Sequence, residues 1–207
     1  MANKILSSAL ILLLLSITTV SFTQKNKNME TFTDSRDGQV YKTIKIGNQI
    51  WMAENLAYKT ERGCWAYDND KTKVAEYGYL YDWKTAKASC PKGWHLPSDE
   101  EWTELINYLG GKELAGEKLK SSNWNLFDGK NYGNNSSGFS TLPNGFCIDH
   151  GRGMMIFGGL GEDGNLWSST TNGSDASYYK LDADRSSIGQ DNIDHSSGLA
   201  VRCIKEN

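Results

Sequence analysis

Hydrophobic and polar residues alternate in the segment 40–52, and this pattern predicts a β-hairpin. Val40, Lys42, Ile44 and Ile46 fall on one face of the first strand. Gly47-Asn48 follows, a two-residue sequence of the type that tight hairpin turns require. We therefore expect the chain to reverse at this point and to return as a second strand.

The strongest helical signal begins at Ser98. Ser98 and Glu101 have the spacing of a capping box, in which each side chain binds a backbone N–H of the first turn. Hydrophobic residues then recur with helical spacing from Trp102 to Leu109, and Gly110-Gly111 provides the stop. A short helix is expected before Cys90, and a weaker helical pattern occupies residues 112–122.

From Ser121 onward the sequence is irregular and rich in Asn, Gly and Ser. A long irregular stretch inside a compact domain usually carries function or is disordered. The aromatic residues spaced through this stretch favour an ordered conformation. Trp124 and Tyr132 are candidates for stacking on sugar rings, whereas Trp167 is expected in the core. Short strands are expected in residues 153–159, 165–170, 177–184 and 198–206.

The first 24 residues have the pattern of a secretory signal peptide. Lys4 provides the positive n-region, and a short apolar run follows it. The alternative is a membrane anchor, but the run is short against the roughly 20 residues that a span needs. We expect a signal peptide over 1–24, a flexible leader over 25–35 and one domain over 36–207. The mature chain would then be extracytoplasmic, either periplasmic, at the cell surface or secreted.

The charge and composition of the chain limit the classes of partner that it is expected to bind. The formal net charge is −3, and the sequence has no basic stripe, which argues against nucleic acid as a partner. No other segment of the mature chain is apolar enough to predict a transmembrane helix. The chain has four cysteines, and an even number in an exported protein indicates two disulfides. Their spacing leaves three pairings open and makes a zinc site improbable.

The motifs for catalysis and metal binding are weak. His95, His150 and His195 are scattered, and no nucleophile elbow is present, so we predict no catalytic residue. The Asp-rich stretch 182–194 lacks the Gly and Glu that an EF-hand requires, and is interpreted as a solvated hairpin loop. We predict no cofactor and no metal ligand. The alternative is a calcium site of another design, with these candidate ligands: Asp182, Asp184, Asp191 and Asp194.

Several long motifs together resemble one family. They include "DGQVYKTIKIGNQIWMAENL", "CPKGWHLPSDEEWTELINYLGG", "GFSTLPNGF" and "VRCIKE", in that order. The chain from residue 34 to 206 resembles the Fibrobacter succinogenes major paralogous domain family. This resemblance implies an exported bacterial protein, often surface-associated, whose biochemical role is undefined. "WHLPSDEEW" is also similar to a stretch of formylglycine-generating-enzyme-like proteins, which implies an α+β, C-type lectin-like fold with two main helices and terminal strands side by side.

The same resemblance implies specific pairings and sites. In lectin-like folds a disulfide ties a helix to the last strand, which implies a Cys90–Cys203 bond and leaves Cys64 to pair with Cys147. The Cys90–Cys203 bond would close a loop of about 110 residues, worth about 4–5 kcal/mol in the chain-entropy model. The alternative is that Cys64 and Cys147 are free.

Function is expected to depart from both remote relatives. The oxidase relatives bind copper through a close cysteine pair, which is missing here. The motif "LPN" places Leu142 where calcium-dependent lectins have a carboxylate, although its Asn144 stays a ligand-binding candidate. We expect a non-catalytic binding module for a surface glycan or an envelope protein. The alternatives are a structural surface protein without a small ligand and a diverged formylglycine-generating-type enzyme.

Overall fold

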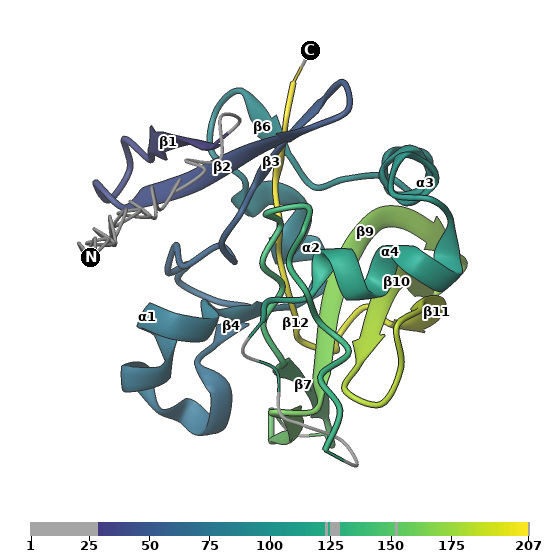
Figure 1. Ribbon diagram of the computed structural model, residues 1–207. Helices are drawn as coiled ribbons and strands as arrows, with labels where there is room; N and C mark the ends of the chain where they lie inside the picture. The colour runs from purple at the N-terminus through teal and green to yellow at the C-terminus, as the bar shows by residue number, and fades with distance from the viewer. Residues whose placement is uncertain (1–28, 123, 125–128, 152, 207) are drawn as a thin grey trace, which may run out of the picture.

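The computed structural model describes residues 29–122, 124, 129–151 and 153–206 as a mixed α+β domain. Two sheets lie one above the other in the view of Figure 1, and the C-terminal segment runs between them. The expected signal peptide and residues 25–28 of the expected leader lie outside the described residues. In the part of the chain that is described, no helix has both the length and the apolar character needed to cross a membrane.

The smaller sheet contains the predicted hairpin. Strands β2 and β3 pair antiparallel with Ile46 opposite Gln49, so Gly47-Asn48 forms the turn as predicted. Ile204 of the last strand pairs with Trp51 of β3, and the N-terminal strand β1 lies at the edge of the same sheet, beyond β2. In spatial order the strands are β1 (Met29–Thr33), β2 (Val40–Ile46), β3 (Gln49–Met52), β13 (Ile204–Lys205) and β6 (Trp94–His95).

The larger sheet has a mixed topology. Its main path is antiparallel except where β12 runs parallel to β9, and the β7–β8 hairpin joins beside β9. The path runs through β11 (Ile188–Asp194), β10 (Asp175–Asp182), β9 (Asp163–Asn172), β12 (Leu199–Ala200), β5 (Leu80–Tyr81) and β4 (Cys64–Trp65), with β7 (Asn144–Asp149) and β8 (Met155–Leu160) beside it.

Two features of this sheet correct the sequence interpretation. Residues 188–194 form strand β11 and not a solvated loop, and only residues 183–187 connect it to β10. β11 lies at the edge of the sheet and most of its residues are exposed, so it lacks the alternation that marks a half-buried strand. The expected strand over 198–206 is split into β12 and β13, which belong to different sheets.

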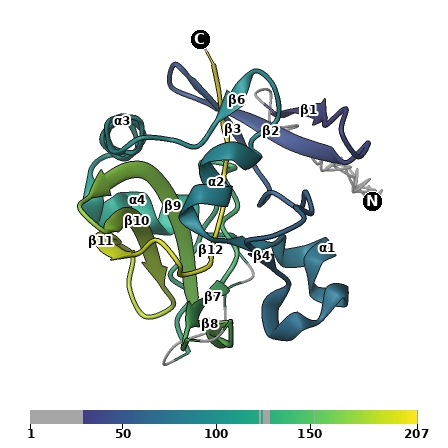
Figure 2. The same ribbon diagram turned by 180° about the vertical axis from the view of Figure 1, so that it is seen from behind.

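The helices pack around the sheets, with α2 between them in both views (Figures 1 and 2). The capping box predicted for α3 is present, because Ser98 accepts from the Glu101 N–H and the Glu101 carboxylate accepts from the Ser98 N–H. The helices are η1 (Tyr67–Asn69), η2 (Lys71–Lys73), α1 (Val74–Tyr77), α2 (Trp83–Ser89), α3 (Asp99–Tyr108) and α4 (Lys112–Leu119).

An aromatic cluster joins distant segments in the core. Trp51 of β3 and Trp102 of α3 lie with their ring centroids 5.0 Å apart. Phe139, from the irregular region, packs on both indoles at 5.5 and 5.9 Å. Tyr179 of β10 stacks on Trp102 at 4.7 Å. All four side chains are buried, so the irregular region is anchored in the core through Phe139.

The cysteines confirm one implied pair and correct the other. Cys90, at the end of α2, is bonded to Cys203, which directly precedes β13. Cys64 and Cys147 are free thiols, so the second implied pair is wrong in this structure. The indole of Trp65 lies 3.2 Å from the position that a Cβ on Gly198 would take, and Cys147 Sγ approaches the same position. Neighbouring strand residues point to opposite faces, so Cys64 points away from Cys147.

Candidate functional site

Arg202 is a buried cation at the junction of three chain segments. Its side chain is 1% exposed and comes from the connection between β12 and β13. Nε donates to Asn55 Oδ1 at 2.7 Å, in the segment after β3. Nη1 donates to the carbonyls of Met52 and Phe139, and Nη2 donates to the Ser140 carbonyl at 2.9 Å. The guanidinium therefore holds the irregular region against β3 and the C-terminal segment.

The backbone is strained at Ser140. This residue has φ of 58°, in the left-handed region that non-glycine residues rarely adopt. The Asn135 side chain supports it, since Oδ1 accepts from the Ser140 N–H and Nδ2 donates to Ser140 Oγ. The Arg202 bond to its carbonyl completes the support. Such strain persists only where the surroundings enforce it, and it gathers at functional sites.

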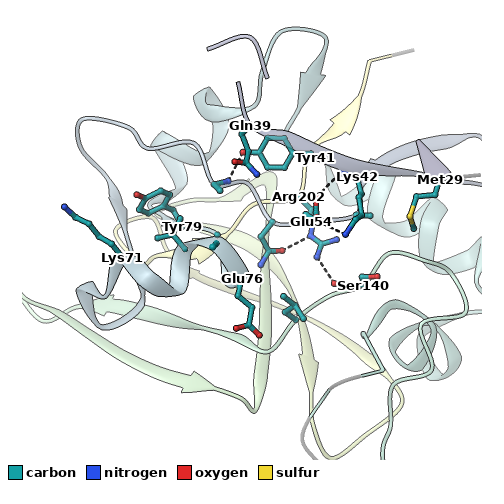
Figure 3. A pocket seen from close by; sticks show the side chains of 17 residues that line it. Met29, Gln39, Tyr41, Lys42, Glu54, Lys71, Glu76, Tyr79, Ser140 and Arg202 are labelled. Carbon is teal, nitrogen blue, oxygen red and sulfur yellow. Dashed lines mark hydrogen bonds and ion pairs between the residues drawn. The ribbon is translucent and has the colours of Figure 1, made fainter. Parts of the chain in front are cut away.

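A cavity of about 560 Å³ lies against this junction. Its walls come from β1 and β2, the segment after β3, the η2–α1 turn and the strained segment, as Figure 3 shows. A cavity of this size falls in the range that binds small molecules in proteins. The lining residues are Met29, Gln39, Tyr41, Lys42, Ala53, Glu54, Asn55, Ala57, Lys71, Val74, Ala75, Glu76, Gly78, Tyr79, Ser140, Leu142 and Arg202.

The cavity carries charges of both signs. Lys42 and Glu54 form an ion pair at 3.2 Å, and their side chains turn toward each other near Arg202 (Figure 3). Lys71 and Glu76 lie on the α1 side of the cavity. Burial without a bound carboxylate lowers the pKa of Arg202 to about 9, although the Glu54 charge opposes the shift. The guanidinium therefore still carries its positive charge at neutral pH.

Tyrosines supply the aromatic part of the wall. Tyr41 is buried, and its hydroxyl accepts from the Ala57 N–H at 3.0 Å. Burial raises the pKa of Tyr41 to about 12, so the phenol stays neutral. Tyr79 is half-buried and packs edge-on against Tyr81, with the ring centroids 6.3 Å apart. The partly open ring of Tyr79 is a surface on which a sugar ring or an apolar group can pack.

A second buried cation lies beneath two of the aromatic candidates. Lys120 is fully buried, and Nζ donates to the carbonyl of Asp182, the last residue of β10, and to that of Arg185 in the β10–β11 connection. The same ammonium lies 5.2 Å from the Trp124 ring centroid and 5.8 Å from that of Tyr132. Burial lowers the pKa of Lys120 to about 8, against the raising effect of nearby carboxylates. Lys120 thus fixes the connection and the irregular region to the end of α4.

Two of the three ligand-binding candidates lie in the core. Trp124 is 3% exposed and its indole N–H donates to the Thr141 carbonyl, so it is a core residue. Asn144 is fully buried and donates to the carbonyls of Gly145 and Asn165. Both residues lie in polar, loop-like sequence. The segments that bury them are distant along the chain, so the local sequence does not predict their burial. Tyr132 is half-buried, and a role in ligand binding stays a prediction for it. Trp167 is buried in the core as expected.

The aspartates weighed for calcium do not converge on one point. Asp182 pairs with Lys180 and Arg185, and Asp184 also pairs with Arg185. Asp194 accepts from Ser196 in the turn after β11. Across the described residues, no three His, Cys, Asp or Glu side chains form a group that would hold a metal.

The histidines are in separate environments. His95 Nε2 lies 2.7 Å from Glu101 Oε1, so it is tied to the capping box of α3. His195 stacks on Trp83 with the centroids 4.3 Å apart. His150 is exposed at the tip of the β7–β8 hairpin. The structure does not bring the three together.

Arg202, Glu54 and Tyr79 did not stand out in the sequence. Arg202 lies in "VRC" and Asn55 in "MAENL", and both segments carry the family resemblance. A cation inside an otherwise apolar segment indicates that buried hydrogen-bond acceptors surround it, because an unpaired charge is costly to bury. The sequence gives no indication of which segments supply that set.

The comparisons with known proteins give one match. The model of the family described as Fibrobacter succinogenes major domain matches residues 44–205. Neither the curated proteins nor the solved structures gave a match. The matched range includes β3, both helices α3 and α4, and the Arg202 junction. This chain belongs to the Fibrobacter succinogenes major domain family.

Proposed function

We propose that this chain is an exported, non-catalytic binding module and that the cavity beside Arg202 is its binding site. The observation that carries the proposal is the combination of this cavity with a strained wall and a fully buried guanidinium. Strained backbone and a concave site with a few polar groups are typical of binding sites. The ligand we propose is a surface glycan, because the wall combines the Tyr79 ring with positively and negatively charged side chains that can form hydrogen bonds.

Two features support the wider setting. The Cys90–Cys203 disulfide is of the kind that persists in oxidising compartments, which supports export. The pairing of β13 with β3, and the disulfide from the end of α2 to the start of β13, support the finer proposal of a C-type lectin-like fold. The mixed α+β architecture is compatible with it.

A glycan screen tests the binding function. The oxidised domain is applied to arrays of glycans and envelope polysaccharides, once with calcium and once with a chelator. We expect binding that is independent of calcium and that Tyr79→Ala weakens at least about tenfold, the loss typical of a central aromatic contact. Tyr108→Ala is the matched control, since Tyr108 is 66% exposed on α3 and does not line this cavity.

Three outcomes decide between the functions. Calcium-dependent binding would mean that the glycan binds at a metal-dependent site and not in this cavity. Equal binding by the Tyr79 and Tyr108 variants would place the ligand elsewhere on the surface. No binding at millimolar ligand, together with self-association in sedimentation, would favour the structural surface protein. The exposed Ile148 and Ile156, opposite each other in the β7–β8 hairpin, are the surface that such an association would use.

A further inference from the structure

We propose that the cavity selects a carboxylate-bearing saccharide, whose acid group lies on the Arg202 side of the cavity. This inference rests on the proposed binding function and names its ligand class.

No carboxylate forms a hydrogen bond or an ion pair with Arg202 in the described part of the chain, and Glu54 acts on it only through space. Its four hydrogen bonds go to one amide oxygen and three backbone carbonyls, which are dipoles and not anions. These bonds use four of the five N–H groups of a guanidinium and leave one on Nη2. A buried charge is normally paired, so the site retains the capacity to bind an anion.

The cavity borders Arg202, although the side chain is only 1% exposed. The other sides are occupied by the carbonyls of Met52, Phe139 and Ser140 and by the Phe139 ring, whose centroid lies 4.8 Å from the guanidinium carbon. Lys42 and Glu54 neutralise each other at the edge of the cavity. The Glu76 carboxylate points away from Arg202 in Figure 3. The guanidinium is therefore the one cation of the cavity wall that is buried and has no ion-paired carboxylate among the described residues.

The charges of the wall favour a monoanion. Glu54 and Glu76 both line the cavity and would repel a phosphate dianion more strongly than a single carboxylate. A carboxylate also needs only one or two donors here, and Arg202 has a single N–H left. An acidic saccharide fits this wall better than an acidic peptide does. The half-buried Tyr79 ring can pack on a sugar ring, and the side chains of Gln39 and Glu54 can form hydrogen bonds with its hydroxyl groups.

A matched pair of ligands tests the acid group. Galacturonate and glucuronate oligosaccharides are compared with their methyl esters, which keep the sugar and remove the charge. Titration calorimetry on the full oxidised chain should show that the acid binds at least about tenfold more tightly than the ester, in line with the loss of one charge-assisted contact. The preference for the acid should shrink as salt is raised.

Two variants shift the charge of the wall in opposite directions. Lys42→Gln removes a positive charge and should weaken binding of the acid about three- to tenfold, while Glu54→Gln should tighten it by a similar factor. Both side chains are well exposed, so folding is preserved. Lys45→Gln and Glu61→Gln are the matched controls, since both residues are exposed and outside this cavity, and each should stay within about twofold of wild type. Arg202 is left intact because its loss would leave three core carbonyls unpaired.

The outcomes separate this inference from the binding function. Equal affinity for acid and ester, with both lost in Tyr79→Ala, would overturn the carboxylate preference and keep the binding module. Tighter binding of inorganic phosphate or of a glutamate peptide than of the acidic saccharides would overturn the ligand class. Unchanged affinity in both charge variants would overturn the placement of the acid beside Arg202. If no glycan binds in the wider screen, the binding function itself fails.

Discussion

At the scale of single residues, two buried cations organise the irregular region. Arg202 binds the carbonyls of Phe139 and Ser140, and Lys120 binds those of Asp182 and Arg185. Both use backbone carbonyls in place of carboxylates, so the charge fixes the path of a segment that has little regular structure. The cost is the desolvation of the cation, which lowers the pKa of each side chain.

Lys120 makes stability depend on pH in a defined direction. Its folded pKa of about 8 is below the usual lysine pKa of 10.5, so the unfolded chain binds more protons between these two pH values. The free energy of unfolding should therefore rise as pH increases above about 8, and this stabilisation is lost as pH falls through 8. Below pH 8 the full cost of burying the ammonium is present.

Substitution of Lys120 isolates this effect. In Lys120→Met we expect the free energy of unfolding to lack about 1–2 kcal/mol of the rise seen in wild type between pH 7.5 and 9.5. Denaturant titrations at several pH values measure it, and the difference between the two proteins cancels the titration of tyrosines and Cys147. Lys112→Met, at an exposed position of α4, should follow the wild-type profile. Parallel profiles for wild type and Lys120→Met would contradict the assignment.

At the scale of elements, local signals and packing act differently on the two main helices. α3 has a capping box and an apolar stripe within its own sequence, so its start at Asp99 was predictable from residues 98–109. α4 has only a weak pattern, yet it forms a complete helix of 8 residues. Its buried face consists of Ala115, Gly116 and Leu119, and the small residues allow the backbone of the β10–β11 connection to approach closely.

Gly116 is the position where this approach is tightest. A Cβ there would meet the carbonyl oxygens of Ser186 and Ser187 well inside contact distance. Alanine favours a helix over glycine by about 1 kcal/mol, but the clash with backbone cannot be relieved by a side-chain rotation. We expect Gly116→Ala to lower the free energy of unfolding by about 1–3 kcal/mol. Chemical denaturation measures the change.

An exposed site on the same helix provides the comparison. Lys112→Ala changes helix propensity without meeting any packed segment, and should leave the free energy of unfolding within about 0.5 kcal/mol of wild type. A stabilised Gly116→Ala protein would mean that α4 and the β10–β11 connection do not pack as closely as described.

At the scale of the whole molecule, one covalent bond closes most of the domain. Cys90 and Cys203 are 113 residues apart in sequence, and their bond joins the end of α2 to the start of β13. A long closed loop loses much conformational entropy in the unfolded state, which stabilises the folded state. The Arg202 junction lies next to this bond in the chain, so the disulfide also holds the C-terminal wall of the cavity in place.

Removal of the disulfide should therefore be costly. The double variant Cys90→Ala/Cys203→Ala is expected to lose about 4–5 kcal/mol in the free energy of unfolding, measured by denaturant titration without reductant. Cys64→Ala removes a free, partly exposed thiol and is the matched control, with a change below about 1 kcal/mol. A loss of similar size in Cys64→Ala would indicate that Cys64 is covalently paired after all.

The sequence alone determined the features whose causes are local. The hairpin at Gly47-Asn48 and the capping box at Ser98 follow from turn chemistry and hydrogen bonds within a few residues. The family followed from long ordered motifs, and the Cys90–Cys203 pair followed from the resemblance to lectin-like folds and not from spacing.

The tertiary structure decided everything that depends on partners distant in sequence. Strand β11 is held by pairing with β10 and not by its own pattern, and Trp124 is buried because Thr141 and Lys120 close over it. The candidate site is the clearest case. Arg202 bonds to Asn55 across 147 positions and to Ser140 across 62, and no local pattern specifies such contacts. They form only when both sheets and the irregular region have packed, because the free energy of burying the cation is recovered only from the complete set of carbonyls.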